Sequence, residues 1–178
     1  METIAIQDKI FKRSIAASEI QSMVTDIAAR MNYDLEGDDV VFVAILNGAF
    51  MFASDLIRKI KVNCRITFLK LASYQGSNST GIIKQLIGLN EVLKDKTVVI
   101  VEDIVDTGIT LDTVLRQIES FQPKEIKVAA LLFKPDVYTF SHRIDYVGFN
   151  IPNEFVVGYG LDYNGYGRNL EHIYTITD

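Results

Sequence analysis

The amino-acid sequence predicts an α/β fold, in which a mainly parallel central sheet is flanked by helices. Short, almost wholly apolar runs such as 40–46 and 97–101 recur along the chain, and segments with helical periodicity separate them. Continuous apolar runs are typical of parallel strands that are covered on both faces. The 178 residues contain no Gly/Ser/Pro-rich linker and no internal repeat, so we expect residues 1–178 to form a single domain.

The first half of the chain is predicted to alternate helices and strands. Ser18 followed by Gln21 resembles a capping box, and apolar residues then recur with the spacing of one helical face from Ile20 to Met31. Residues 40–46 (VVFVAIL) favour a buried strand. The next two elements are an amphipathic helix and a β-rich strand, at residues 50–60 and 62–71.

A polar stretch separates that strand from the second half of the chain. Residues 73–81 (SYQGSNSTG) exceed the roughly two to five residues usual for a hairpin loop, so we expect a flexible functional loop. A strand at 82–89 follows, and a helical stripe at 111–121 is ended by Pro123. The other expected strands are residues 97–101, 126–133, 144–149 and 155–157. The loop and the late strands predict a small antiparallel or irregular cap on the main sheet.

The composition argues against several classes of protein. The net charge is −5 and the pI is near 5.1, so the chain lacks the broad basic surface of a general nucleic-acid binder, and we expect no nucleic-acid partner. Its apolar runs are far shorter than the roughly 20 residues that span a bilayer, and the N-terminus lacks the pattern of a secretory signal. The single cysteine, Cys64, suits a reducing compartment. We therefore expect a cytoplasmic protein without a membrane partner.

The most informative segment is residues 98–110 (VVIVEDIVDTGIT), where an apolar strand runs into acidic residues and then a helix. Ligands of open parallel sheets bind beyond the carboxyl ends of the strands, so this segment lies where a site is expected. Residues 107–110 offer backbone N–H groups, two hydroxyls and a glycine at a helix N-terminus, which suits a phosphate monoester. Glu102 and Asp103 suit sugar hydroxyls or a hydrated divalent cation. A ligand with a phosphate and a nearby diol would suit both groups of residues.

This segment resembles the phosphoribosyl pyrophosphate (PRPP) signature of the type I phosphoribosyltransferases. Together with Lys134, three further stretches resemble the branch that acts on 6-oxopurines, the hypoxanthine-guanine phosphoribosyltransferases: residues 46–49, 73–74 and 155–168. The resemblance covers essentially the whole chain. It implies a magnesium-dependent purine-salvage enzyme that transfers the 5-phosphoribosyl group of PRPP to N9 of hypoxanthine, and of guanine, giving IMP or GMP and pyrophosphate.

The resemblance also implies how PRPP is bound. Glu102 and Asp103 would hold the ribose hydroxyls, and Asp106 would be the general base that accepts the proton from N7 of the purine, because a carboxylate is ionised at neutral pH. The 5′-phosphate would be bound by Asp106, Thr107, Gly108, Ile109 and Thr110. Pyrophosphate would be contacted by Asn47, Gly48 and Arg168.

A second group of residues is implied to bind the purine. Lys134 would donate a hydrogen bond to O6, Phe155 would stack on the base, and the backbone of Val156 would bond its edge, with Asp162 nearby. Adenine carries an amino group in place of O6, so a donor would face a donor and this base should be rejected.

Magnesium and a lid complete the implied site. Asp162 matches the family's magnesium ligand, and Glu102 and Asp103 are further candidate ligands of Mg²⁺. Ser73 and Tyr74 would belong to a flexible loop that closes over the reacting centre and excludes water.

Three positions depart from the family pattern. Many members carry Lys or Arg at the positions of Asn47 and Ile109, and some carry Lys at the position of Glu154. The first two changes weaken pyrophosphate binding unless the backbone makes the main contacts. The third leaves the ranking of hypoxanthine, guanine and xanthine open.

Two other functions remain possible on this sequence. One is a regulatory protein that binds mRNA and senses pyrimidine nucleotides, as some bacterial proteins of this fold do; the acidic pI and the presence of Asp106 and Lys134 argue against it. The other is a xanthine-preferring phosphoribosyltransferase. The partners that we expect are the small-molecule substrates and a second copy of the chain, since family members are commonly homodimers or homotetramers.

Overall fold

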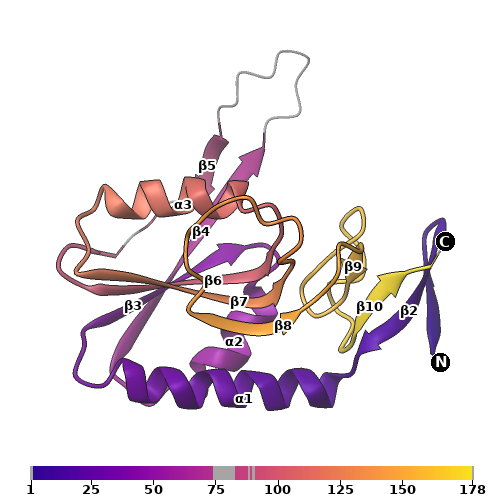
Figure 1. Ribbon diagram of the computed structural model, residues 1–178, viewed down its shortest axis with the longest axis horizontal. Helices are drawn as coiled ribbons and strands as arrows, with labels where there is room; N and C mark the ends of the chain where they lie inside the picture. Colours follow the sequence, from indigo (N-terminus) through magenta and orange to yellow (C-terminus); the bar gives the residue numbers. More distant parts are fainter. Residues whose placement is uncertain (1, 74–82, 88, 90, 178) are drawn as a thin grey trace.

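The computed structural model has the α/β fold class that the sequence predicts (Figure 1). It describes residues 2–73, 83–87, 89 and 91–177. The strands of the main sheet are β3 (Val40–Leu46), β4 (Cys64–Ser73), β5 (Ile83–Ile87), β6 (Thr97–Val105), β7 (Glu125–Phe133) and β8 (Tyr146–Asn150). Their order is β5-β4-β3-β6-β7-β8, in which β5 pairs antiparallel with β4 and all other neighbours are parallel.

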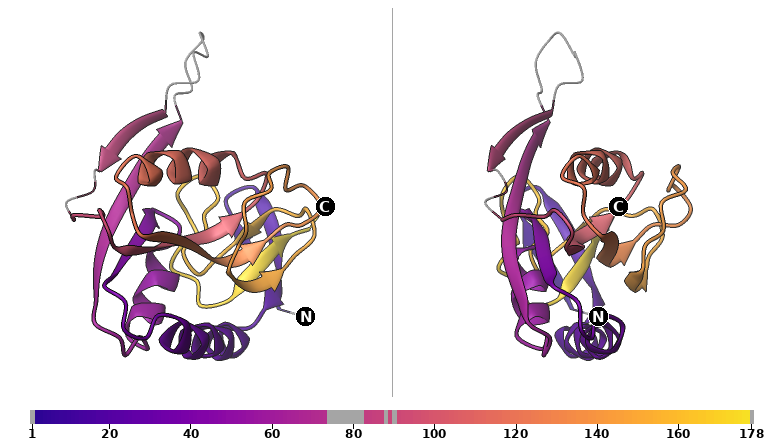
Figure 2. Two further views of the ribbon diagram at one scale, coloured as in Figure 1. Left: turned by 60° about the vertical axis from the view of Figure 1, so that its left-hand side comes forward. Right: turned by 90° about the vertical axis from the view of Figure 1, so that its left-hand side faces the viewer.

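The helices of the described residues cover both faces of this sheet (Figures 1 and 2). The helices α1 (Ala17–Asp34) and α2 (Phe50–Ile57) lie on one face, and α3 (Ile109–Glu119) lies on the other. Successive residues of β3 supply the two cores, since Phe42 packs in the α1 and α2 cluster and Val43 packs in the α3 cluster. This double burial explains the uninterrupted apolar run of β3.

The start of α1 differs from the prediction. Ala16 precedes the first helical residue, and its backbone N–H donates to the carboxylate of Glu19 at 2.8 Å. Ser18 and Gln21 lie inside the helix, so the capping box that they were predicted to form is wrong. Glu19 thus makes one of the two hydrogen bonds of a capping box, whereas Ala16 has no side-chain oxygen that could accept the other.

The strand β6 is longer than its apolar run. The sequence predicts a strand that ends at Val101, but pairing with β7 continues to Val105 and includes Glu102 opposite Ala130. Backbone hydrogen bonds to a neighbouring strand extend the element because they do not depend on apolar side chains. Glu102 and Asp103 are therefore held on the rigid end of a central strand.

A second, four-stranded antiparallel sheet forms a cap beside the main sheet (Figure 1). Its strands are β1 (Thr3–Ile6), β2 (Lys9–Ile15), β10 (Ile173–Ile176) and β9 (Val156–Val157), in that spatial order. Of the late strands from which the sequence predicts a cap, only 155–157 contributes to it, as β9, whereas 144–149 lies in the main sheet as β8. Phe11 is fully buried in the cap against Val157 and Tyr174. The cap therefore joins segments from both ends of the chain.

Of the predicted flexible loop at 73–81, the structure describes only the first residue. Ser73 is the last residue of β4, whereas Tyr74 and the rest of the predicted loop to Gly81 lie outside the described residues. Within the part of the chain that the structure describes, no helix is both long enough and apolar enough to cross a membrane.

Candidate active site

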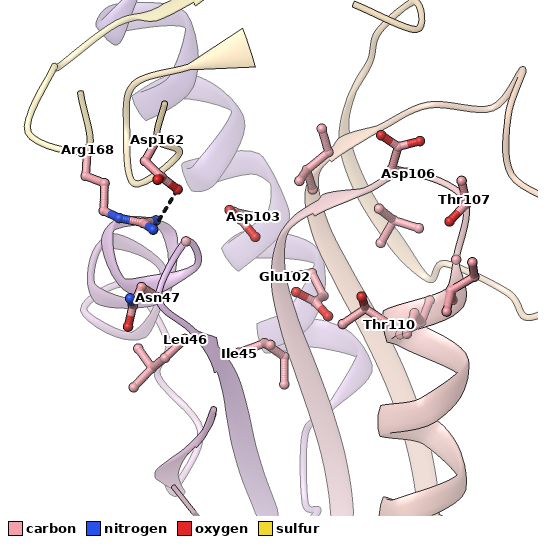
Figure 3. A pocket seen from close by; sticks show the side chains of 16 residues that line it. Ile45, Leu46, Asn47, Glu102, Asp103, Asp106, Thr107, Thr110, Asp162 and Arg168 are labelled. Atoms are coloured by element: carbon pink, nitrogen blue, oxygen red, sulfur yellow. Dashed lines mark ion pairs between the residues drawn. The ribbon is translucent and has the colours of Figure 1, made fainter. Parts of the chain in front are cut away.

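A cavity of about 340 Å³ opens at the carboxyl ends of β3 and β6, as expected for a parallel sheet (Figure 3). Three segments line it: the turn after β3, the end of β6 with the first residues of α3, and the cap turn that carries Asp162 and Arg168. The structure thus brings together the PRPP residues that the sequence singled out, namely Asn47, Gly48, Glu102, Asp103, Asp106, Thr107, Gly108, Ile109, Thr110 and Arg168.

A second cavity of about 250 Å³ adjoins the first. It is lined by Lys134 from the end of β7 and by Phe155 and Val156 from the cap. The two cavities share Asp103, Ile104, Asp106 and Asp162. Every predicted PRPP, purine and magnesium residue therefore lines at least one of the two, and the shared carboxylates stand at the junction.

The loop before α3 is shaped to receive an anion. Gly108 has a φ of +93°, a left-handed conformation that glycine adopts without strain, and it precedes the first residue of α3. The first N–H groups of a helix have no partner within the helix, and the helix dipole adds positive potential there. The hydroxyls of Thr107 and Thr110 line the same cavity (Figure 3).

The turn after β3 packs backbone against the other walls of the cavity. The Leu46–Asn47 peptide bond is cis. A Cβ atom added to Gly48 would lie 1.6 Å from Oδ2 of Asp103, and one added to Gly160 would lie 2.1 Å from the carbonyl oxygen of Gly48. A side chain at position 48 or 160 would therefore force its neighbours to shift, at the place where the turn, the end of β6 and the cap meet.

The carboxyl groups at the end of β6 are electrostatically unfavourable in the ligand-free protein. Burial raises the pKa of Glu102 well above its ordinary value, and the negative charge of Asp103 adds to this effect. Burial also raises the pKa of Asp103 to about 6, and the charge of Asp162 adds to it. The backbone N–H groups of Asp103 and Ile104 and the guanidinium of Arg168 act in the opposite direction.

Arg168 and Asp162 are paired with each other at one side of the larger cavity (Figure 3). The Arg168 Nη2 to Asp162 Oδ1 distance is 2.6 Å, and Arg168 Nη1 donates to the carbonyl of Gly160 at 2.7 Å. Asp162 also accepts the backbone N–H of Gly165 at 2.6 Å. These contacts fix both side chains within the cap turn, and about 30% of each side chain remains accessible to a ligand.

Lys134 is a buried cation that faces the smaller cavity. Its side chain is 8% exposed, and its Nζ lies 2.8 Å from Oδ2 of Asp106 and 3.3 Å from Oδ1 of Asn153. Phe155 is 46% exposed beside this pair and meets Tyr163 edge to face. The sequence analysis missed Asn153, because a polar residue in an Ile-Pro-Asn-Glu turn is typical of loops and carries no pattern of its own.

The residues present fit a magnesium ion. Among the described residues, no group of three or more His, Cys, Asp and Glu side chains could hold a metal alone. Mg²⁺ in phosphate complexes usually takes only one or two carboxylates, with substrate oxygens and water completing its shell. Asp103 and Asp162 line both cavities, and the pKa of Asp103 is raised mainly by burial and to a smaller extent by the charge of Asp162. A divalent cation beside them would relieve the repulsion between the two carboxylates.

Comparison with known proteins identifies the family. Residues 16–164 match the phosphoribosyl transferase domain model. The chain belongs to the phosphoribosyl transferase family. This phosphoribosyltransferase is 37% identical over 169 residues to the hypoxanthine-guanine phosphoribosyltransferase of Mycobacterium tuberculosis, a match that covers 91% of this chain and 84% of the relative.

Solved structures agree with this assignment. The hypoxanthine phosphoribosyltransferase of Staphylococcus aureus superposes with a TM-score of 0.87 and 36% identity, covering 93% of this phosphoribosyltransferase and 91% of that chain. A hypoxanthine-guanine phosphoribosyltransferase of Bacillus anthracis, solved with a HEPES molecule in its active site, gives a TM-score of 0.88 at 36% identity, covering 96% and 99% of the two chains.

Proposed function

We propose that this phosphoribosyltransferase is a magnesium-dependent purine-salvage enzyme. It transfers the 5-phosphoribosyl group of PRPP to N9 of hypoxanthine, and of guanine, and releases pyrophosphate. The relatives named for these bases support the proposal, and they match over most of their length. The proposal extends their named activity to this chain through the residues of its own two cavities.

The observation that carries the purine assignment is the pairing of Lys134 with Asp106. A buried donor and an acceptor lie 2.8 Å apart beside the exposed ring of Phe155. A 6-oxopurine presents O6 and N7 side by side on one edge, so the carbonyl suits Lys134 and a proton on N7 suits Asp106. Adenine presents an amino donor to the buried ammonium group and leaves it without an acceptor, which is costly.

The chemistry then follows from Asp106. N9 attacks C1′ of the ribose, the bond from C1′ to the pyrophosphate oxygen breaks, and Asp106 accepts the proton that leaves N7. Phe155 holds the base by stacking, and Lys134 stabilises charge at O6. Because Lys134 pairs with Asp106 in the ligand-free protein, the incoming purine exchanges one charge-assisted contact for two new ones.

PRPP is proposed to fill the larger cavity. Residues 106–110 would hold the 5′-phosphate, and Glu102 and Asp103 would accept hydrogen bonds from the ribose hydroxyls. Arg168 and the turn at Asn47 and Gly48 would contact the pyrophosphate.

Magnesium is proposed to enter with PRPP. The larger cavity is lined by the carboxyl groups of Glu102, Asp103, Asp106 and Asp162. Among its described lining residues, Arg168 is the only cationic side chain. A pyrophosphate group would therefore meet net repulsion unless a cation accompanied it. Asp162 and Asp103 would hold Mg²⁺, which neutralises the leaving pyrophosphate.

A spectrophotometric assay tests the proposed reaction. Hypoxanthine, guanine, xanthine, adenine and uracil are offered separately with PRPP, with and without Mg²⁺. We expect turnover of hypoxanthine and guanine, none of adenine or uracil, and no turnover without the metal. A faster reaction with xanthine would replace the substrate assignment. Turnover of no base, together with tight and salt-sensitive RNA binding in a filter assay, would support a regulatory protein instead.

A further inference from the structure

The segment 138–142, here called the strap, follows β7 and lies against the loop that begins α3 (Figure 1). The backbone N–H and the side-chain hydroxyl of Thr139 both donate to the carbonyl oxygen of Thr107, at 3.2 and 3.1 Å. The Thr107–Gly108 peptide unit is therefore held from outside the cavity by two donors of a single residue.

Two aromatic rings of the strap pack against Gly108. A Cβ atom added to Gly108 would lie 2.5 Å from Cε2 of Tyr138 and 2.8 Å from Cδ2 of Phe140. The rings thus touch the Cα of Gly108, and a larger residue there would displace them. Gly108 serves two needs, a left-handed φ of +93° and the close approach of the strap.

The strap is held together by internal contacts and is anchored to β7 and to α3. The Tyr138 hydroxyl donates to the carbonyl of His142 at 2.9 Å, and the Tyr138 ring meets Phe133 of β7 edge to face. His142 Nε2 lies 2.9 Å from Oδ1 of Asp112 in the first turn of α3, and its ring stacks on Phe140. The strap therefore ties the start of α3 to the sheet, and its position is set independently of any ligand.

The orientation of the Thr107–Gly108 peptide unit indicates what the strap does. A trans peptide unit is planar, with its C=O and N–H pointing in opposite directions. When Thr139 holds the Thr107 carbonyl on the strap side, the Gly108 N–H points away from the strap. Thr107 and Gly108 line the larger cavity. We propose that Thr139 is a positioning residue, which orients the Gly108 N–H toward the 5′-phosphate of PRPP. This inference rests on the proposed function, because it takes that phosphate as the anion.

The chain offers a matched control for this role. At the far end of the molecule, the N–H and hydroxyl of Thr177 both donate to the carbonyl of Ile10, at 2.8 and 2.9 Å. Thr177 follows β10 of the cap and lines neither cavity. The substitutions Thr139→Val and Thr177→Val remove the same hydroxyl from the same arrangement; Thr139 is exposed and Thr177 is partly exposed. Their effects on stability should therefore be alike.

Binding of ribose 5-phosphate, measured by isothermal titration calorimetry, tests the inference without requiring turnover. We expect Thr139→Val to weaken binding about three- to tenfold and Thr177→Val to leave it within twofold, the range that a single hydrogen bond supplies. Thr139→Ser keeps the hydroxyl and should restore the affinity. In the full assay, Thr139→Val should raise KM for PRPP and leave KM for hypoxanthine unchanged.

The outcomes separate the inference from the proposed function. Equal affinities of the wild type, Thr139→Val and Thr177→Val would overturn the inference and leave the enzyme assignment intact. Equal weakening by both substitutions would show a general loss of rigidity and would also overturn it. If the wild-type protein turns over hypoxanthine but does not bind ribose 5-phosphate, an unchanged KM for PRPP in Thr139→Val would overturn the inference. Absence of both binding and turnover would overturn both.

Discussion

Replacing Asp103 by asparagine should stabilise the ligand-free protein at neutral pH while impairing PRPP binding. Burial raises the pKa of Asp103 from 3.8 to about 6. Between these two values the folded protein binds more protons than the unfolded chain, so its stability falls as the pH rises through this window. Above pH 6 the carboxylate is ionised in both states, and the folded state bears the full cost of burying it. Asparagine keeps the hydrogen-bond acceptor and removes the charge.

The size of the gain follows from the shift. A pKa change of about 2 units corresponds to about 3 kcal/mol at about 1.4 kcal/mol per unit, which is an upper limit because Asp103 is partly exposed to solvent. A realistic gain is about 1 to 3 kcal/mol. For a chain of this size each kcal/mol raises Tm by roughly 2 to 4 °C, so we expect an increase of about 2 to 12 °C.

Thermal melts from pH 4 to pH 8 provide the assay. The gain from Asp103→Asn should be largest above pH 6 and vanish near pH 4. Asp38→Asn is a control of opposite sign, since Lys124 and Thr97 lower the pKa of Asp38. Its carboxylate stabilises the fold above the ordinary pKa and loses this effect as the pH falls, so the substitution should lower Tm at neutral pH. A gain from Asp103→Asn that does not vary with pH would refute the electrostatic reasoning.

Three further substitutions test the reaction. Asp106→Asn should slow turnover by about 10² to 10⁴ in steady-state kinetics, with PRPP binding largely kept. Lys134→Met should raise KM for hypoxanthine about 10- to 100-fold, the range for a lost hydrogen bond to a charged group, and should leave KM for PRPP unchanged. Gly48→Ala should raise KM for PRPP because the new Cβ would lie 1.6 Å from the Asp103 carboxylate; normal kinetics would show that the turn can move.

The sequence predicts the main sheet well and the cap poorly. The core strands are continuous apolar runs because both faces are covered, so β3 agrees with its expected bounds. In the cap, β2 reads KIFKRSI, in which charged residues surround the buried Phe11. Its pairing with β10, which begins at Ile173, depends on contacts between opposite ends of the chain, and local periodicity carries no information about these.

The candidate site likewise has parts that the sequence predicts and parts that it does not. The anion loop at 106–110 could be predicted because one continuous motif contains its strand end, glycine and helix start. The pairing of Lys134 with Asp106 and Asn153 could not, since it joins three separate connections that meet only in the folded sheet. The contact of Thr139 with Thr107 is of the same kind, because an exposed threonine has no distinctive sequence pattern.

The pairing within the cap bears on the order in which this protein becomes active during synthesis. Phe155, the ring proposed to stack on the base, adjoins β9, whose partner is β10, and the backbone N–H of Ile176 donates to the carbonyl of Phe155 at 3.0 Å. All strands of the main sheet and the whole anion loop precede β10 in the chain. Under the proposed function, a nascent chain can therefore assemble the phosphate-binding half of the site first. The proposed nucleobase pocket is complete only after β10 has left the ribosome, so partial chains would bind PRPP without consuming it.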